Sequence, residues 1–466
     1  MGNAPSRKPT YEELEAENAD LRRRMTTLEE QLKRALGRIE ELERAKKRQA
    51  APFSKGDPKS EPKRPGRKPG DDYGKWYCRP PPKRIDETID VPLPAACPEC
   101  GGHHLNELSV EDQFQTDLPQ VRPIHRRFRV HVGRCGSCGS PVQGRHRLQT
   151  SDALGAAAVQ LGPNALSLGT TLNKAFGLSF GKVSSFLARA FGLQASRSAF
   201  CRAAERLAKR VGPTYESMVT AARSSSVVNV DETGWKVGGR REWLWTFVTR
   251  KYTVYRIAPS RGHDVIESVL GGDYSGLVGR DGWAAYDFLT EAGHQSCLAH
   301  HLARAADLLE FAHRGAARFA HAVTRVLRDS LRLRDRRSEL STRGFAAARG
   351  RIEARMDRLL AWQPTWGPNA KFVRHLRDER PHLFTFLYHP EIEATNWPAE
   401  QAIRPAVITR KVCGGGNRTR RGARAQEILV SFLRTCAQQG RDAIKLFVRA
   451  FRSRRPIRYA LALSPP

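Results

Sequence analysis

Acidic residues and long apolar runs are both scarce in this sequence. Its 466 residues hold 48 Asp and Glu against 79 Lys and Arg, which gives a formal net charge of +31. No apolar run reaches the roughly 18 residues that a membrane-spanning helix needs, and the first residues lack the apolar core of a signal peptide. We therefore expect a cytoplasmic protein that has no membrane partner and that binds nucleic acid, because basic side chains on phosphates release counterions. A merely basic protein of the ribosomal type is the alternative.

Cysteine is infrequent, and four of its nine copies form two CxxC pairs. The pairs are Cys97–Cys100 and Cys135–Cys138. This usage argues against a disulfide framework, whereas two CxxC turns supply the four soft ligands of a tetrahedral zinc site. We expect residues 86–150 to form a small zinc-binding domain with structural Zn²⁺. Four free thiols are the alternative.

Residues 11–45 repeat apolar side chains every seven positions. One heptad frame places its a positions at Tyr11, Asn18, Met25, Leu32 and Ile39, and its d positions at Leu14, Leu21, Leu28, Ala35 and Leu42. The repeat predicts a left-handed coiled coil, and an Asn at an a position favours a parallel dimer. We assign residues 1–50 to a coiled-coil dimerisation segment and residues 51–85 to a flexible basic linker rich in Pro, Gly and Lys. A single amphipathic helix packed on its own protein is the alternative.

Residues 151–220 follow a helical pattern. Two helices are expected over 179–192 and 193–211, and the second has a serine cap. A helix, a turn with glycine and a capped helix are typical of a helix-turn-helix (HTH) DNA-binding region. Arg197 and Arg202 would face DNA in such a motif. An ordinary pair of packed helices is the alternative.

The pattern changes from helices to strands after residue 221. Three strands rich in aromatic and β-branched residues are expected before residue 260, and a short helix over 262–272 follows them. A fourth strand precedes Asp281, and the chain is then helical up to about residue 390. We therefore expect an α/β RNase H-like domain over 221–466, interrupted by an all-helical insertion at about 305–390.

Two carboxylates follow apolar strand residues in this domain. Asp231 comes after VVNV and Asp281 comes after GLVGR, and we expect each of them to end its strand. Glu400 would join them from a helix across the edge of the sheet. Three such carboxylates can hold two Mg²⁺ ions for phosphodiester chemistry, because Mg²⁺ prefers oxygen ligands. The alternatives are that Glu232 or Asp287 takes the place of a neighbour, or that a strand-end Asp only caps a turn.

Four blocks of the sequence resemble the DDE transposases of the IS66 insertion-sequence family. They are VDETGW (230–235), RDGWAAYD (280–287), CLAHHLAR (297–304) and NWPAEQAIRPAVITRKVCGGGNRTRRGA (396–423). The last block departs from the family pattern at Gln401, where Arg is usual, and at the Trp-Pro that precedes Ala399. The order of coiled coil, basic linker, CxxC pairs and helical region also follows the family, so the resemblance covers nearly the whole chain.

The resemblance implies a role for each matching residue. Asp231, Asp281 and Glu400 match the three catalytic acids, which bind Mg²⁺ ions that Mn²⁺ can replace. Cys297 and His300 match a CxxH element, which we interpret as support for the strand and helix of the site and not as a zinc site, because only two ligands are local. Arg304 belongs to the same supporting group, and the residues implied to contact DNA phosphates are Arg404, Arg410, Lys411 and Arg418.

The implied function is that of a DNA transposase that binds terminal inverted repeats and catalyses Mg²⁺-dependent strand cleavage and strand transfer. Its partners would be the DNA ends, the target DNA, a second copy or more joined through the coiled coil, and small accessory proteins. It would act in the bacterial cytoplasm, at the nucleoid. A zinc and HTH DNA-binding regulator and a catalytically inactive transposase relic are the alternatives.

Overall fold

The computed structural model describes residues 10–12, 15, 19–26, 29–30, 80–312, 314–413 and 415–460. The chain divides into two units, Met1–Thr88 and Ile89–Pro466. Most of the predicted heptad seam, including Asn18, lies outside the described residues, and so does the predicted linker as far as residue 79.

The described residues of the first unit that lie between positions 11 and 30 are helical. Arg24 pairs with Asp20 one turn earlier in the same helix, at 2.7 Å. Tyr11, Leu21 and Met25, three residues of the predicted seam, are 81%, 50% and 60% exposed. Within the described residues of this unit these three side chains are therefore not covered, and the coiled-coil pairing stays a prediction.

The second unit begins with an extended segment that contains the two CxxC turns. Cys97 N donates to Gly102 O, and Cys135 N donates to Ser140 O, so both turns have the same backbone closure. Strands β1 (Val132–Arg134) and β2 (Pro141–Gln143) form an antiparallel hairpin around the second turn.

Three helices follow this hairpin: α2 (Pro163–Lys174), α3 (Phe180–Phe191) and α4 (Arg197–Arg223). Ser179 and Ser196 cap α3 and α4, as serine side chains commonly do at helix starts. Helix α4 runs well past residue 211, where its end was expected, and continues through Pro213. Its inner face is buried on both sides of Pro213, and this packing offsets the lost backbone hydrogen bond.

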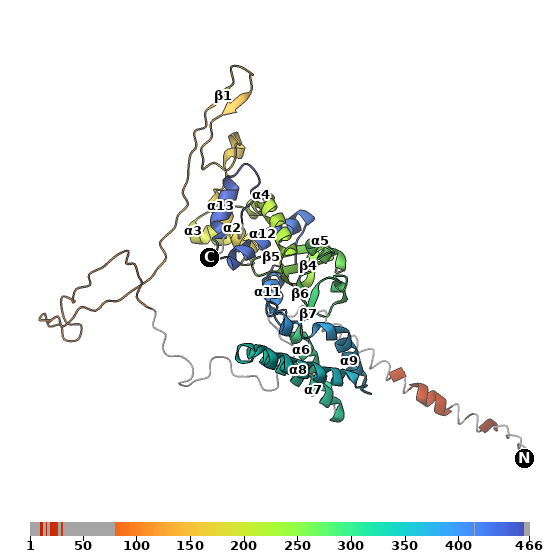
Figure 1. The fold of residues 1–466 in the computed structure, drawn as a ribbon. Coiled ribbons are helices and arrows are strands. Elements are labelled where there is room, and N and C mark those ends of the chain that lie inside the picture. The colour runs from red at the N-terminus through yellow and green to blue at the C-terminus, as the bar shows by residue number, and fades with distance from the viewer. Residues whose placement is uncertain are drawn as a thin grey trace, which may run out of the picture. The chain divides into compact units, whose positions relative to one another are not determined.

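A five-stranded mixed sheet forms the centre of the second unit (Figure 1). Its strand order is β5 (Thr253–Ala258), β4 (Arg240–Val248), β3 (Val227–Val237), β6 (Leu277–Arg280) and β7 (Gly293–Ser296). The pairs β5–β4 and β4–β3 are antiparallel, whereas β3–β6 and β6–β7 are parallel. Gly238 and Gly239 make the β3–β4 turn at φ of 58° and 82°, a left-handed conformation that glycine adopts freely.

Helices cover both faces of this sheet. Helices α4 and α5 (His263–Leu270) pack on one face, in a core that includes Val230, Phe247 and Val278. Helix α11 (Trp397–Val412) packs on the other face, where Ile403 and neighbouring residues meet Leu244 and Tyr255. This mixed sheet between helical layers is consistent with the predicted RNase H-like domain.

Helix α12 (Arg420–Gln438) covers the edge of the sheet at β5. Three of its side chains, spaced four residues apart, accept hydrogen bonds from alternate backbone N–H groups of that strand. The bonds join Ile257 N to Glu427 Oε1 (2.6 Å), Tyr255 N to Ser431 Oγ (2.8 Å) and Thr253 N to Thr435 Oγ1 (3.1 Å). The outer N–H groups of β5 are therefore satisfied by side chains. Helix α13 (Ala443–Arg452) follows α12.

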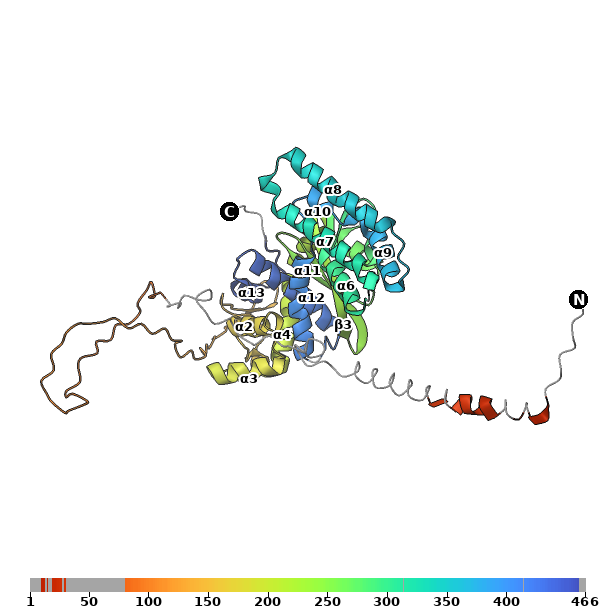
Figure 2. The same cartoon turned by 90° about the horizontal axis from the view of Figure 1, so that it is seen from below.

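The helical insertion lies between β7 and α11 in the chain, and its helices are grouped together in Figure 2. Its helices are α6 (Leu298–Phe311), α7 (Ala317–Asp335), α8 (Thr342–Ala361), α9 (Gly367–Glu379) and α10 (Thr385–Tyr388), so the helical stretch starts earlier than residue 305. Strand β7 was not expected, because its sequence GHQS is polar. Its polar groups bind the insertion instead: Gln295 Oε1 accepts from Phe386 N at 2.9 Å, and His294 O accepts from Thr385 Oγ1 at 2.6 Å.

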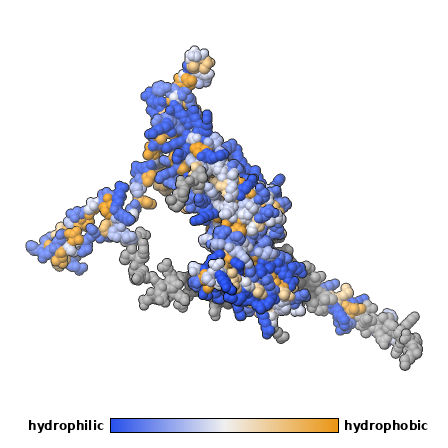
Figure 3. All heavy atoms as spheres, in the orientation of Figure 1, coloured by the Kyte–Doolittle hydropathy of each residue, from blue (hydrophilic) through white to orange (hydrophobic). Residues whose placement is uncertain are grey.

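The surface of the insertion is mostly polar. Hydrophilic side chains dominate the face of α7, α8 and α9 that Figure 3 shows. Across the parts of the chain that the structure describes, no helix has both the length and the apolar composition to cross a membrane.

A buried ion pair anchors the insertion to the sheet. Arg280, the last residue of β6, is 1% exposed, and its Nη1 donates to both oxygens of Glu379 on α9 at 3.0 Å. The same Nη1 donates to the backbone carbonyl of Asp281 at 2.9 Å. The insertion thus fixes the backbone at the end of β6.

We predict that Glu379→Ala destabilises the protein by about 3–5 kcal/mol, because it leaves a buried guanidinium without its partner. The neighbouring Asp378 is exposed, so Asp378→Ala should change the free energy of unfolding by less than about 0.5 kcal/mol. Urea unfolding of both variants measures the difference. Equal stability of the two variants would contradict the anchoring role of the pair.

Candidate active site

Asp231 lies in the middle of β3. The strand continues to Val237 because its second half pairs with β4, and Asp231 stands opposite Thr246 in that register. The expectation that Asp231 ends its strand was therefore wrong. The parallel pairing of β3 with β6 stops at Asn229, so Asp231 lies just beyond the point where the two strands separate. Its Oδ1 accepts a hydrogen bond from Glu232 N at 2.9 Å.

Asp281 follows directly after β6, as expected. Its Oδ1 accepts a hydrogen bond from Trp283 N at 3.1 Å, which holds the carboxylate at the strand end. Strands β3 and β6 are parallel neighbours, so Asp231 and Asp281 leave the paired region at the same end of the sheet.

Glu400 lies in the first turn of α11, and Asn396 before it ties that helix to the sheet. The buried Asn396 side chain donates from Nδ2 to Val230 O at 2.6 Å and accepts from Asn229 Nδ2 at 3.1 Å. Gly279 leaves room for this amide pair, because a Cβ there would collide with Asn229. Helix α11 is thereby held against the residue that precedes Asp231.

The three carboxylates lie close enough to repel one another. Burial raises the pKa of Asp231 to about 7, and repulsion from Glu232, Asp281 and Glu400 adds to the increase. The three predicted acids come from β3, the end of β6 and α11. The fold brings Asp281 and Glu400 close enough to Asp231 for their charges to affect it. A bound cation would relieve that repulsion.

The two alternative acids have other partners. Glu232 accepts from Arg261 Nε at 2.8 Å and from Tyr286 OH at 3.2 Å. Burial and repulsion from Asp281 raise the pKa of Glu232. Asp287 is 62% exposed and lies 3.5 Å from Arg280. These contacts favour Asp231 and Asp281 over their neighbours as ligands of a cation.

The side chains present fit a magnesium site in their chemistry. Carboxylate oxygens are the ligands that Mg²⁺ prefers, and Asp231, Asp281 and Glu400 supply them from three segments of the fold. Their oxygens do not all lie within 4.8 Å of one another. Among the described residues, the one group of three potential metal ligands at that spacing is Cys297, His300 and Glu400.

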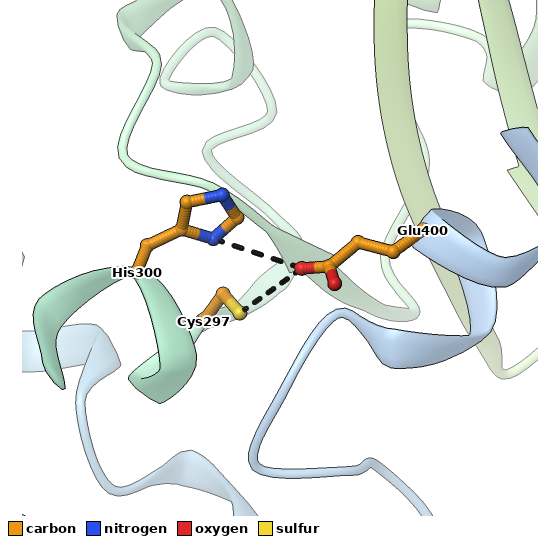
Figure 4. A group of neighbouring side chains, drawn as sticks. All are labelled: Cys297, His300 and Glu400. Atoms are coloured by element: carbon orange, nitrogen blue, oxygen red, sulfur yellow. Dashed lines mark hydrogen bonds and ion pairs between the residues drawn. The ribbon is translucent and has the colours of Figure 1, made fainter. Parts of the chain in front are cut away.

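Cys297 and His300, at the start of α6, both face Glu400 of α11 (Figure 4). Glu400 Oε1 lies 3.9 Å from Cys297 Sγ and 3.9 Å from His300 Nδ1. A hydrogen bond to Cys297 raises the pKa of His300 to about 9 against the opposing effect of burial, and the charge of Glu400 adds to the increase. The protonated His300 side chain therefore places a positive charge near Glu400. Arg404, one helical turn after Glu400 in the sequence, is exposed.

The four cysteines of the predicted zinc site lie in two separate turns. Backbone and side-chain hydrogen bonds involving Cys100 lower the pKa of Cys97, and hydrogen bonds to Ser140 lower that of Cys138, with a further contribution from Cys135. Within the described part of the chain, no three of these four thiols gather within 4.8 Å of one another. Joint binding of one zinc ion by both turns stays a prediction.

Most of the basic residues predicted to contact DNA are exposed, but Arg410 has a partner in the fold. It donates to Thr233 Oγ1 at 3.2 Å and also to Gly234 O, so it joins α11 to β3. The exposed residues of the predicted set are Arg197, Arg202, Arg404, Lys411 and Arg418, and the supporting residue Arg304 is exposed as well.

Sequence reasoning missed the residues that position the acids. Asn396, Arg280 and Glu379 touch the segments that carry Glu400 and Asp281, yet none of them was predicted. One signal was available, because an arginine inside the apolar run before Asp281 requires a buried partner. That its partner is Glu379, 99 residues later, depends on tertiary packing.

The raised pKa of Asp231 predicts a pH-dependent stability. The ordinary pKa of an unfolded Asp is about 3.9, so between about pH 4 and pH 7 the folded chain retains a proton that the unfolded chain has lost. The stability contributed by protonated Asp231 therefore falls as pH rises through this window. Asp231→Asn should raise the melting temperature in EDTA at pH 8, and by much less at pH 5.

Calorimetry at the two pH values measures this effect. Asp307→Asn, which removes an exposed acid on α6, is the matched control and should show no such difference. Added Mg²⁺ at pH 8 should stabilise the unmodified protein more than Asp231→Asn. An equal gain for Asp231→Asn at both pH values would refute the raised pKa.

Comparison with known proteins identifies the family. One similar protein is the uncharacterized protein y4qI of Sinorhizobium fredii (strain NBRC 101917 / NGR234), 27% identical over 230 residues. The match covers 44% of this chain and 42% of that relative, so the chain spans less than half of the relative's length. Residues 158–425, more than half of the chain, match the family described as Transposase IS66 family. They contain β3, β6 and α11 with the three acids, and the chain belongs to the IS66 family of transposases.

Proposed function

We propose that this protein is a DNA transposase that cleaves the ends of its element and joins them to target DNA. The observation that carries the proposal is the convergence of Asp231, Asp281 and Glu400 from three segments of the fold. Burial raises the pKa of Asp231, and repulsion from Glu232, Asp281 and Glu400 adds to that increase. Repulsion between neighbouring carboxylates destabilises the folded protein unless a bound cation compensates their charge. A site for divalent cations in a chain of charge +31 fits chemistry on a polyanion.

The three acids would hold two Mg²⁺ ions. When bound, these ions would activate the attacking hydroxyl group or water and stabilise the leaving oxygen of the phosphodiester. The chain's own part is to fix the ligands: Asn396 holds α11 against β3, and Arg280 holds the backbone of Asp281. Such prior positioning lowers the cost of assembling the reactive geometry.

A basic hollow beside α4 supports DNA binding near the predicted HTH region. Burial and repulsion from Arg202 lower the pKa of Arg206, as expected where cations crowd together. Asp152 is the one acid among its described lining residues, and it pairs with two of the arginines there. The arginines that line the hollow are Arg145, Arg202, Arg206, Arg210 and Arg454. We propose that these side chains hold DNA phosphates.

The N-terminal segment and the CxxC turns are proposed to bring two copies together and to contact DNA. The exposed seam residues Tyr11, Leu21 and Met25 would pair two copies, so that two DNA ends are held together. The zinc region and the α3–α4 pair would contact the terminal repeats. Small accessory proteins would assist, and the reaction would take place on DNA in the bacterial cytoplasm.

Glu400→Gln tests the proposed chemistry. The unmodified protein should nick a labelled end of its own element with Mg²⁺ or Mn²⁺ and not with EDTA. Glu400→Gln should lower the nicking rate at least about 100-fold, because it removes one ligand charge, while DNA binding by gel shift stays within about twofold. The exposed Glu393→Gln is the matched control and should nick normally.

Other outcomes separate the alternatives. Tight end binding without nicking, even after accessory proteins are added back, would favour the regulator or the inactive relic. Nicking that persists in Glu400→Gln would show that Glu400 is not a ligand.

Cys97→Ser tests the predicted structural zinc. This variant should lose one equivalent of zinc and should expose residues 97–138 to protease, because the turns are closed by few other contacts. Elemental analysis and limited proteolysis measure both effects. Unchanged zinc content would remove the site.

A further inference from the structure

Glu400 faces two sets of potential metal ligands that differ in chemistry. The first set is the carboxylates Asp231 and Asp281, which repel each other and offer only oxygen ligands. The second set is Cys297 Sγ and His300 Nδ1, each 3.9 Å from Glu400 Oε1. Sulfur, nitrogen and oxygen together select borderline or soft cations such as Zn²⁺ over Mg²⁺.

The spacing of the second set is close to that of a tetrahedral zinc site. With Zn–S of about 2.3 Å and Zn–N and Zn–O of about 2.1 Å, the ligand atoms of such a site stand about 3.4–3.6 Å apart. The three atoms in this chain all lie within 4.8 Å of one another. Movement of the Glu400 and His300 side chains, which are 40% and 47% exposed, would bring the three atoms to that spacing.

The sulfur is held in place for this role. Cys297 is the N-cap residue of α6, and its buried Sγ accepts a hydrogen bond from Asn396 N at 3.1 Å. Asn396 is also the N-cap residue of the helix that carries Glu400. One backbone junction thus fixes both the thiol and the carboxylate, while His300 follows three residues later on the first turn of α6.

We propose that Cys297, His300 and Glu400 form a binding site for a thiophilic divalent cation of the zinc type, with water as the fourth ligand. Binding releases the proton of the Cys297 thiol and the proton of the His300 imidazolium to the solvent, and leaves a thiolate and a neutral imidazole as ligands. The site is separate from the two CxxC turns. It shares Glu400 with the carboxylates, so a zinc-type ion there draws this ligand away from Mg²⁺, a consequence that rests on the proposed function.

Cobalt binding tests the site directly. The probe is Co²⁺ added to the metal-free, full-length protein under reducing conditions, followed by the absorption bands of thiolate-bound cobalt. The unmodified chain should bind one equivalent more than Cys297→Ser, and the bands of that equivalent should be missing in the variant. His300→Ala and Glu400→Gln should bind this equivalent at least tenfold more weakly. Millimolar Mg²⁺ should not displace it.

A control variant and a folding check separate loss of the site from other effects of the substitutions. Cys201→Ser removes an exposed thiol outside the site and should bind cobalt as the unmodified chain does. Circular dichroism shows whether Cys297→Ser is folded, and His300→Ala, which alters an exposed side chain, carries the test if it is not. Equal cobalt stoichiometry and affinity in the unmodified chain and the folded variants would overturn the proposal. The assay contains no DNA, so its outcome is independent of whether the protein nicks DNA.

Discussion

Repulsion between carboxylates is the constraint on which the candidate active site of this fold depends. Asp231, Asp281 and Glu400 come from three separate segments, and burial raises the pKa of Asp231 to about 7 with added repulsion from Glu232, Asp281 and Glu400. Something must hold these segments together against the repulsion. The Asn396 amide ties α11 to β3, and the buried Arg280–Glu379 pair ties the end of β6 to the insertion. Hydrogen bonds and an ion pair between segments distant in sequence therefore fix the relative positions of the segments that carry the three acids, which the apolar cores alone would not fix.

The sequence predicted those elements whose residues have a strong local preference. Strand β6, helix α5 and the position of Asp281 were expected from an apolar run and its turn residues. Strand β3 is longer than expected, because Glu232 and Gly234 are poor strand formers and only pairing with β4 keeps them extended. Strand β7 was missed because its polar side chains are satisfied by the insertion, a contact that no local pattern reveals.

The same limit applies to the site. The site residues Asp231, Asp281 and Glu400 were predicted from the position of acids after apolar strand residues and from a family resemblance. The family assignment is confirmed over residues 158–425, and the roles of the three acids stay a prediction. The proximity of Cys297 to Glu400 joins residues 103 positions apart. The sequence indicated which residues can act as ligands, but it did not indicate that Cys297 and Glu400 lie together. Their proximity arises because the first residues of two helices meet at Asn396.

Both edges of the central sheet are closed by side chains. Glu427, Ser431 and Thr435 occupy the outer N–H groups of β5, and the insertion binds the polar groups of β7. A strand from another molecule could pair with β5 only after these bonds are lost. Extension of the central sheet at β5 is therefore an unfavourable way for copies of this protein to assemble. The bonds to β5 in this way protect the protein from edge-to-edge aggregation.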